Sequence, residues 1–593
     1  MDLTQQPCQA FHAYVCGRYK ETQIDPLSKL VAKNLSSRIQ AEFLKIKSTS
    51  DNESAKEKAA AFLGGCLSSS EDAQKKESSN TLVRFLKQNS LLFEVAGARN
   101  IDLLDQTFRF LLEYNLRLFF WLFVEPWPRR GEAVRYIHLV TSDKSWIDMR
   151  DRSADKNRYE ELVKQVLLAA SVPEDDQFAA IVQNIISMEE KVMNIRNQSF
   201  ENASYTLSLA AEWGSALKTH SKGVLDEGYI LNLKSNIPAF LNAVSAELDA
   251  NESALYLTWK VAGHLASVAG LVTDDHWERR QEFCFGETHT LFKNAVVAPY
   301  LFHAVDQATV TEVRRMIDLV AQELQVSIRY SNWPEPDIRS RLQEKIAAAK
   351  WKLGYSMGLN YWGGVDRFYS DYPVPVGPFL ETYLDTSRAY ALQQLTLQPH
   401  WSADFANVII DSEEPTVFYG GPNTVTVPAA AMLSPFFNVR ERAALNYGAL
   451  GSIVTRHLMQ AFNDDNRVDD GKGSPIDWSE SELSRFREHW NCHQNLHPGP
   501  SYEDAEPAVS IGAHALFRAY KVAAAGQFAP AVPEGLSSDQ LFFVSRCYAY
   551  CGDKSLDAPH ECDVLAQDSV EFAKVFGCPP GSPMNPEKKC DAW

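Results

Sequence analysis

One stretch late in the chain constrains the fold more than any other: Leu445–Asp464, with the sequence LNYGALGSIVTRHLMQAFND. No Gly or Pro interrupts it after Gly451, so a helix can run to its end. Its apolar side chains recur at spacings near 3.6 residues, at Leu450, Ile453, Val454 and Leu458. This periodicity predicts a helix with one apolar face. The fold must therefore supply a core against which that face can pack.

Length and charge narrow the class of protein. The chain has 593 residues, enough for a large buried core and more than one domain. Acidic residues outnumber basic ones by 76 to 58, which gives a formal net charge of −18. Nucleic acids and anionic membranes attract concentrated positive charge, so the composition argues against both as partners.

Cysteines and glycosylation sequons indicate a secretory setting. The chain carries ten cysteines. It also carries five Asn-x-Ser sequons, at Asn34, Asn52, Asn197, Asn202 and Asn251. The N-terminus lacks the apolar core of a signal peptide, and the longest apolar run, Leu118–Val124, is too short to span a bilayer. We therefore expect an extracellular protein, secreted or the ectodomain of a membrane-anchored one, whose targeting segment is absent from this chain.

Three segments resemble one family of enzymes. The helical stretch Leu445–Asp464 resembles the zinc-binding helix of the neprilysin and endothelin-converting-enzyme family of zinc metallopeptidases, in which L-N-Y-G-G leads into G-H-E-x-x-H-G-F-D-D. The closing residues Phe572–Trp593 resemble that family's F-x-x-x-F-x-C and M-N-P-x-x-x-C-x-x-W, and Pro7–Tyr19 resembles its opening P-C-x-D-F-x-x-Y-A-C-G-x-W. The resemblance covers nearly the whole chain and is strongest at both ends.

In the helix, the family's frame is kept and its chemistry is not. The two zinc-ligating histidines of the motif fall on Arg456 and Gln460, and the catalytic glutamate falls on His457. Arginine stays protonated and repels a cation, and glutamine is a poor zinc ligand. His457 lies a fraction of a turn away from the face that the two ligand positions share. His457 stands at the position of the general base, but without a metal there is no activated water for it to deprotonate. The alternative is that His457 is an ordinary helix histidine with structural hydrogen bonds.

The other catalytic positions are also degenerate. Registered on residues 512–520, the zinc glutamate of the family falls on Ala505, and the aspartate that orients its first histidine falls on Val509. His560 is the one candidate remnant of the oxyanion-stabilising pair, the alternative being a surface-loop histidine. The arginine of that pair is missing, because no Arg follows Arg546. We therefore expect no catalytic residue, no metal site and no cofactor, although zinc is the family cofactor.

One substrate-binding element could survive these losses. A short segment resembles the N-A-F-Y edge strand with which the family pairs the backbone of its substrate, at Thr416, Val417, Phe418 and Tyr419. Edge pairing needs only backbone N–H and C=O groups. The asparagine that grips the peptide in the family is replaced by threonine. The alternative is a plain core strand.

A rival metal site must also be weighed. Three histidines recur every four residues, at His489, His493 and His497. On one helix they would share a face and could bind a transition metal weakly. The competing interpretation, which we favour, is a solvated histidine face.

The resemblance also implies how the cysteines pair. The implied bridges are Cys8–Cys578, Cys16–Cys551, Cys66–Cys284 and Cys492–Cys590. Cys547 and Cys562 are left over and fall outside the family pattern, and we predict a fifth bridge between them. Sequence alone would not give this connectivity. Each bridge that closes a long loop would stabilise the fold by roughly 2–5 kcal/mol.

The fold implied by the resemblance is mainly α-helical and two-lobed, with a small β-sheet beside the zinc-motif helix. Residues 7–400 would form the N-terminal, mostly helical capping region, and residues 407–593 the C-terminal, thermolysin-like region. Apolar patterns predict a strand at Tyr136–Val140 and a helix over Pro336–Leu353. We predict loops for two polar or Gly-rich stretches, Ser68–Asn80 and residues 355–373.

These observations favour an inactive, neprilysin-like pseudo-peptidase. Such a protein would bind or sequester extracellular peptides, or act as the partner of an active relative. The competing class is an active zinc metalloendopeptidase that cleaves small extracellular peptides, which family membership alone would suggest. A purely structural adhesion module is a third class and would bind no peptide.

Overall fold

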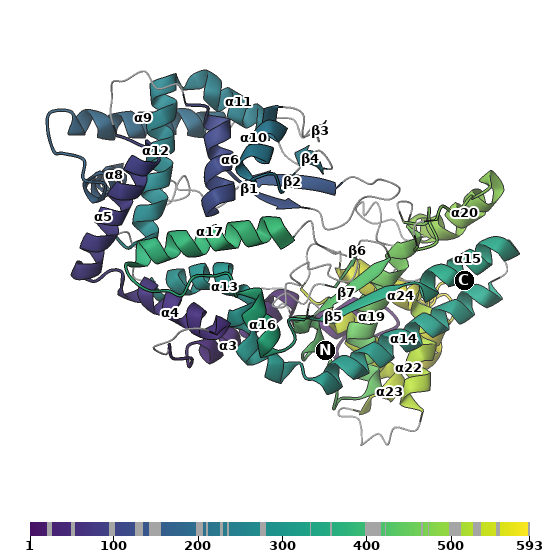
Figure 1. Ribbon diagram of the computed structural model, residues 1–593. Coiled ribbons are helices and arrows are strands. Elements are labelled where there is room, and N and C mark those ends of the chain that lie inside the picture. The colour runs from purple at the N-terminus through teal and green to yellow at the C-terminus, as the bar shows by residue number, and fades with distance from the viewer. Residues whose placement is uncertain are drawn as a thin grey trace. The chain divides into compact units, whose positions relative to one another are not determined.

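The computed structural model shows a mostly helical protein with two small β-sheets (Figure 1). The expected mainly α-helical fold class is thereby confirmed. Among the described helices, none is both long and apolar enough to cross a membrane. The residues that the structure describes are 1–19, 27–48, 54–93, 101–124, 135–141, 156–196, 205–208, 212–225, 229–233, 237–272, 280–331, 334–355, 358–397, 417–420, 423–463, 466–472, 474–496, 512–525, 535–552 and 558–590.

The chain folds into two compact units, each built from stretches that are distant in sequence. Unit 1 consists of Met1–Ile39, Pro299–Asn360 and Val408–Trp593, and unit 2 consists of Gln40–Ala298 and Tyr361–Asn407. The units therefore do not follow the linear division expected near residue 400. The first 39 residues belong with the C-terminal region because disulfides join them to it.

Unit 2 combines a four-stranded sheet with helices. The strand order is β1-β2-β4-β3, in which β2 and β4 are parallel and the two outer pairs are antiparallel. The predicted strand Tyr136–Val140 lies within β2, so that prediction is confirmed. The strands are β1 Phe120–Val124, β2 Arg135–Thr141, β3 Tyr205–Ser208 and β4 Tyr229–Leu233. The helices that lie wholly or mostly in unit 2 are α4 Ala55–Ser68, α5 Asp72–Gln88, α6 Leu103–Tyr114, α8 Lys156–Ala169, α9 Phe178–Arg196, α10 Glu212–His220, α11 Ile237–Glu247, α12 Ala250–Val268, α13 Arg280–Ala304, α16 Trp362–Phe368 and α17 Phe379–Leu397.

Helix α12 is a core helix of unit 2. Most of its side chains are buried, as expected for a helix that is apolar on nearly all sides. The Asp249 side chain caps its start by accepting hydrogen bonds from backbone N–H groups of the first turn. The indole Nε1 of Trp259 donates at 2.7 Å to the buried carboxylate of Glu189, which also accepts a hydrogen bond from the Tyr159 hydroxyl. The buried charge is therefore hydrogen-bonded, as a stable core requires.

Two predicted loops and the end of one predicted helix are wrong. The polar run Ser68–Asn80 contains the first half of helix α5. Leu82 and Phe85 in the second half of α5 are buried, and this burial stabilises the whole helix, including its polar first half. Residues 355–373 contain the short helix α16. The helix predicted over Pro336–Leu353 ends at Ala347, because residues 350–354 instead form a strand. Their pairing partner is about 70 residues away in sequence, where local periodicity cannot reveal it.

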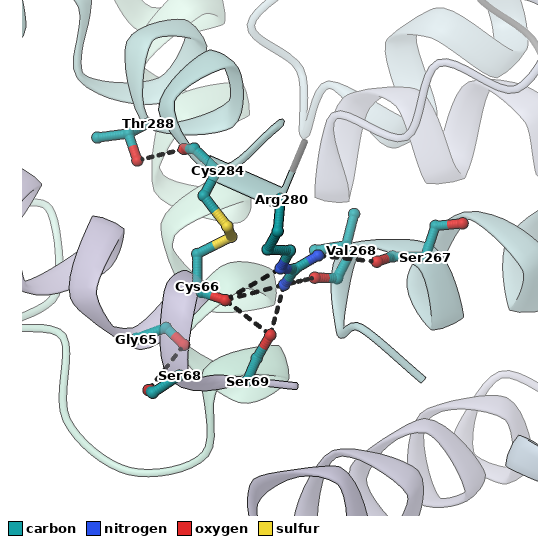
Figure 2. The surroundings of a disulfide bond; sticks show 9 residues. All are labelled: Gly65, Cys66, Ser68, Ser69, Ser267, Val268, Arg280, Cys284 and Thr288. Atoms are coloured by element: carbon teal, nitrogen blue, oxygen red, sulfur yellow. Dashed lines mark hydrogen bonds between the residues drawn. A yellow bond between two sulfur atoms is a disulfide. The ribbon is translucent and has the colours of Figure 1, made fainter. Parts of the chain in front are cut away.

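In unit 2, Arg280 joins the ends of two helices (Figure 2). Its guanidinium donates to the carbonyl of Cys66 at 2.9 and 3.3 Å, in the last turn of α4, and also to the Ser69 hydroxyl. It donates to the carbonyls of Ser267 at 3.4 Å and Val268 at 2.9 Å, in the last turn of α12. The carbonyls of Cys66 and Ser267 also accept backbone N–H groups just past their helices, from Ser69 and Gly270, and all of these carbonyls lie at the negative end of a helix dipole. Burial lowers the pKa of Arg280 to about 10, and the group stays protonated at neutral pH.

Replacing Arg280 should therefore destabilise unit 2. The substitution Arg280→Met keeps an apolar stem and removes every donor, so the carbonyls at both helix ends lose their hydrogen bonds to the guanidinium. We expect a loss of about 2–3 kcal/mol in the free energy of unfolding, measured by urea denaturation followed by circular dichroism. Arg280→Lys is the matched control and should lose less, because it keeps the charge with fewer donors. Unchanged stability in both variants would contradict this role for Arg280.

Unit 1 holds the zinc-motif helix and a three-stranded sheet. The strand order is β5-β7-β6, with β5 parallel and β6 antiparallel to the central β7. The strands are β5 Lys350–Gly354, β6 Phe418–Gly420 and β7 Thr424–Pro428. The helical elements are α1 Phe11–Cys16, α3 Leu27–Phe43, α14 Gln307–Tyr330, α15 Pro336–Ala347, η3 Ala429–Met432, α18 Ala443–Asn446, η4 Tyr447–Gly451, α19 Ser452–Met459, η5 Gln460–Phe462, α20 Glu480–Leu496, α22 Ala513–Ala524, α23 Ser538–Tyr548, α24 Ala558–Asp568 and α25 Val570–Phe576.

Disulfides and aromatic packing tie the N-terminus to the C-terminal region within unit 1. The ring of Phe11 packs edge-on against Phe572 and Phe576, with centroids 4.7 and 5.5 Å apart. The five bridges have the pairing given above: Cys8–Cys578, Cys16–Cys551, Cys66–Cys284, Cys492–Cys590 and Cys547–Cys562. All but Cys66–Cys284 lie within unit 1.

Candidate functional site

The predicted zinc-motif helix is one continuous helical run in unit 1. Residues 443–462 pass from α18 through the π turn η4 into α19 and end in the 3-10 turn η5. The predicted helix is thus confirmed up to Phe462, and its last predicted residue, Asp464, lies outside the described residues. Of its predicted apolar residues, Ile453 is partly exposed, whereas three are buried, at Leu450, Val454 and Leu458.

Two glycines let neighbouring helices approach this run closely. A Cβ at Gly448 would collide with the carbonyl oxygen of Phe542 on α23, and a Cβ at Gly451 would lie 3.2 Å from a methyl group of Leu516 on α22. On another side, α19 packs against β6 and β7, so the small sheet lies beside the helix as expected (Figure 1). The run is therefore enclosed by helices and sheet.

Arg456 and His457 lie in the last turn of α19, and Gln460 begins the 3-10 turn that closes this run. Arg456 is 6% exposed, so its charge lies almost out of solvent. Nδ1 of His457 lies 3.3 Å from the side-chain oxygen of Gln460, and because that oxygen is an acceptor, Nδ1 donates. Burial and the nearby charge of Arg456 lower the pKa of His457 to about 4, against the opposing effect of the Gln460 hydrogen bond. The imidazole is therefore neutral at physiological pH.

The zinc ion that the resemblance implies does not fit these side chains. A guanidinium has no lone pair to give to a metal, and the Gln460 oxygen is already hydrogen-bonded to His457. Within the described residues, one group of three side chains of metal-ligand type has its ligand atoms close together: Cys16, Cys547 and Cys562. All three sulfurs are in disulfides and cannot serve as thiolate ligands.

Strand β6 occupies an edge of the three-stranded sheet. Its residues pair antiparallel with the central strand β7, with Tyr419 opposite Val425. Every residue of β7 is buried, so β7 is the core strand and β6 is the edge strand. Val417, just before β6, is also buried. An edge position leaves one row of backbone groups facing away from β7, which is what strand addition by a peptide requires.

For several of the predicted site residues, the structure gives no position or places them on another element. Thr416, Ala505, Val509 and His497 lie outside them. His560 lies on α24, so its backbone is helical and the surface loop weighed as the alternative is wrong. His489 and His493 both lie on α20, and the solvated histidine face favoured for them stays a prediction.

One positioning residue of this region was not predicted. The fully buried Lys345 on α15 donates to the carbonyl of Asp469 at 2.8 Å and to its carboxylate at 3.2 Å, and also to the Asn466 carbonyl. The Asn423 side chain, just before β7, donates to the carbonyl of Lys345 at 2.7 Å. Lys345 thus joins α15, the start of β7 and the segment that follows the zinc-motif helix. The sequence did contain a sign of this role, because Lys345 stands beside Leu342 and Ile346 on the apolar face of a predicted helix.

Solved structures share this fold. Zinc metalloprotease Zmp1 of Mycobacterium tuberculosis in its open state aligns with a TM-score of 0.65 at 14% identity, over 99% of this chain and 100% of that one. A galactose-containing glycoprotein complex of Haemonchus aligns with a TM-score of 0.63 at 16% identity, over 100% of this chain and 97% of that one. The chain therefore has the fold that these proteins share.

Comparison by sequence then gives the family. Models of peptidase family M13 match residues 7–356 and 416–592. Endothelin-converting enzyme 1 of Bos taurus is 23% identical over 688 aligned positions, which cover 100% of this chain and 87% of the relative. Neprilysin-3 of Drosophila melanogaster is 20% identical over 685 positions, which cover 100% and 85%. The chain belongs to peptidase family M13, which confirms the neprilysin-like resemblance.

The low pKa of His457 predicts a pH-dependent stability. Its ordinary pKa of 6.5 applies in the unfolded chain and about 4 in the folded one. As pH falls from 6.5 to 4, the unfolded state therefore takes up the proton first, and the fold loses up to about 1.4 kcal/mol per pH unit. The variant His457→Gln should lose this component of the slope, measured by urea denaturation between pH 7 and 4.

A matched control for this measurement lies in unit 2. The pKa of His264 is also lowered to about 4, chiefly by burial and then by Lys260, and its Nε2 lies 3.1 Å from the Tyr383 hydroxyl. His264→Gln should remove a separate part of the acid slope, and the double variant should remove both parts. A slope in His457→Gln equal to that of the unsubstituted protein would contradict a lowered pKa of His457 in the folded state.

Proposed function

We propose that this M13 family member is a catalytically inactive peptidase that binds or sequesters extracellular peptides without cleaving them. The observation that carries the proposal is Arg456, a nearly buried guanidinium on the helix face where the family motif has its first zinc-ligating histidine. A fixed positive charge repels the cation that the reaction needs. Without that cation, no bound water is activated for attack on a peptide bond.

The second support is the state of His457, which stands at the position of the catalytic glutamate. A general base works best when its pKa lies near the working pH. Burial and the charge of Arg456 hold the pKa of His457 at about 4, so the imidazole is a weak base. The Ala505 and Val509 positions add to this support, because neither side chain has a donor atom for a metal.

Purified protein should contain far less than one zinc per chain and should not cleave a neprilysin-type fluorogenic peptide. Elemental analysis by mass spectrometry and a fluorescence assay with added zinc measure these quantities. One zinc per chain, or cleavage that phosphoramidon blocks, would support the competing function, an active zinc metalloendopeptidase. The expected reason for inactivity is the missing ligand set and not a misfolded chain.

A gain-of-function variant separates these two reasons. Arg456→His, His457→Glu, Gln460→His and Ala505→Glu together would restore the residue types of the family motif. If the scaffold is intact, this variant should bind zinc close to one per chain. The matched control lacks Ala505→Glu, has two of the three ligands, and should bind zinc more weakly. Failure of both variants to bind zinc, with unchanged circular dichroism, would show that more than these ligands separates the chain from an active peptidase.

The peptide-binding part of the proposal rests on β6. Adding an extended peptide to an edge strand uses main-chain hydrogen bonds, which no substitution at Arg456 or Gln460 removes. The enclosed helix beside β6 and β7 keeps that edge in place. An inactive scaffold that holds peptides would limit their free concentration. Acting as the partner of an active relative is the other role such a scaffold could have.

This binding mode predicts a dependence on the peptide backbone. Short peptides selected from a random library should bind in calorimetry. N-methylation at alternate residues, in the register that faces β6, should weaken binding about tenfold or more because it removes inter-strand donors. Methylating the other alternate residues, whose N–H groups point away from β6, is the matched control and should change affinity little. Equal effects of the two patterns would contradict strand addition.

The extracellular location is part of the same proposal. Five disulfides with no free cysteine among the described residues suit an oxidising compartment. The five sequons suit the same compartment, and two of them have their asparagine on an exposed helix position, at Asn34 and Asn251. At that location, the protein would encounter extracellular peptides, which are the ligands that we propose.

A further inference from the structure

A groove of about 550 Å³ lies in unit 1, away from the zinc-motif residues. Helix α3 forms one wall, the end of α13 and the start of α14 form another, and residues 432–439 form the third. Its size is in the range of pockets that hold a small organic ligand. Its lining includes no residue of β6 and none of Arg456, His457 and Gln460, so the proposed peptide site does not account for it.

The wall formed by α3 has two rows of side chains. Leu27, Val31 and Leu35 form the inner row and are buried. Leu30, Asn34 and Arg38 form the outer row, on successive turns of the helix. Asn34 is the middle residue of the outer row and is exposed, so its amide is reachable from the solvent side of the groove.

Asn34 is also the first residue of a glycosylation sequon, Asn34-Leu35-Ser36. A sugar ring has apolar C–H faces and polar hydroxyl groups, and the groove beside Asn34 has apolar and polar side chains that can contact both. Leu30 and Pro435 supply apolar surface for the C–H faces of a ring. The Tyr300 hydroxyl, which accepts a hydrogen bond from the Arg38 guanidinium at 3.3 Å, gives a polar contact for sugar hydroxyl and acetamide groups.

We propose that Asn34 carries an N-linked glycan whose first N-acetylglucosamine units lie in this groove. In the attachment, Nδ2 of Asn34 attacks the anomeric carbon of an oligosaccharide linked to a lipid diphosphate. The new N–C bond replaces the C–O bond to the diphosphate, Nδ2 loses one proton, and the lipid diphosphate leaves. Oxidation and reduction are not involved. The proposal rests on the extracellular location in the proposed function, since this donor is met in the secretory pathway.

The glycan is favoured over a free ligand because its attachment point is part of the groove wall. A group tethered at Asn34 is held beside the groove at a high effective concentration, so weak contacts suffice to seat it. A free peptide or metabolite would have to bind from solution and would pay the full loss of translational freedom. Occupation of the groove by such a ligand instead is an outcome of the test.

The test uses the full chain secreted from eukaryotic cells, with Asn251 as the internal control. Asn251 is exposed in the first turn of α12 and does not line this groove. Enzymatic deglycosylation in oxygen-18 water, followed by peptide mapping, should mark Asn34 as occupied. In native protein, the glycan at Asn34 should be released about tenfold more slowly than that at Asn251, which corresponds to about 1.4 kcal/mol of packing. After denaturation the two rates should be equal.

Two groove variants should remove this protection. Tyr300→Ala deletes the ring that lines the groove, and Leu30→Glu, at a partly exposed helix position, alters its rim with less risk to folding. Either should bring release at Asn34 to the rate at Asn251. Ser36→Ala should abolish occupancy of Asn34 and leave Asn251 unchanged.

Several results would overturn the proposal. An unmodified Asn34 beside an occupied Asn251 would refute the site and leave the extracellular location standing. Absence of glycan from both would overturn the location as well. An occupied Asn34 released as fast as Asn251, or a groove that binds a free peptide in the glycosylated protein, would refute the seating of the glycan. Zinc content and peptidase activity of the same sample report separately on the inactive-peptidase proposal.

Discussion

The helical run of residues 443–462 is the constraint on which much of unit 1 depends. Helices α22 and α23 approach it closely at two glycines: a Cβ at Gly448 would collide with the backbone of α23, and a Cβ at Gly451 would be in tight contact with Leu516 of α22. Strands β6 and β7 also pack against the run. Because the packing is this close, a change of side-chain volume on this helix would displace the neighbouring elements. The packing side chains Leu450, Val454 and Leu458 are those expected of a metallopeptidase helix. These three side chains are buried, so the packing face of the helix is formed in this chain.

The chemistry of that face has changed in a way that the enclosure makes more consequential. On an open surface, an arginine would be screened by water and would act weakly on its neighbours. Arg456 is nearly buried, and its charge contributes to holding the pKa of His457 at about 4. A positive charge and a neutral imidazole then stand where a peptidase of this family would hold a cation and a carboxylate. Strand β6 is at an edge of the three-stranded sheet, and the side chains at Arg456, His457 and Gln460 take no part in its backbone pairing with β7.

Local patterns predicted some elements well and others poorly, for identifiable reasons. The run through Leu450, Val454 and Leu458 is periodic within itself, so its helix could be read directly from the sequence. Strand β5 could not, because its pairing partner β7 lies far along the chain. The first half of α5 is polar and resembles a loop, and it is helical because burial of Leu82 and Phe85 supports the whole helix.

The sequence by itself determined which side chains stand at the catalytic positions, because residue identity sets metal-binding capacity wherever the chain is placed. It also determined the family, through motifs at both ends and in the middle. The tertiary structure alone decided that Arg456 is nearly buried, that Lys345 joins three segments, and that the sequon at Asn34 borders a groove. The physical reason is that burial, pairing and cavities arise between residues far apart in the chain, and local composition does not record those distances.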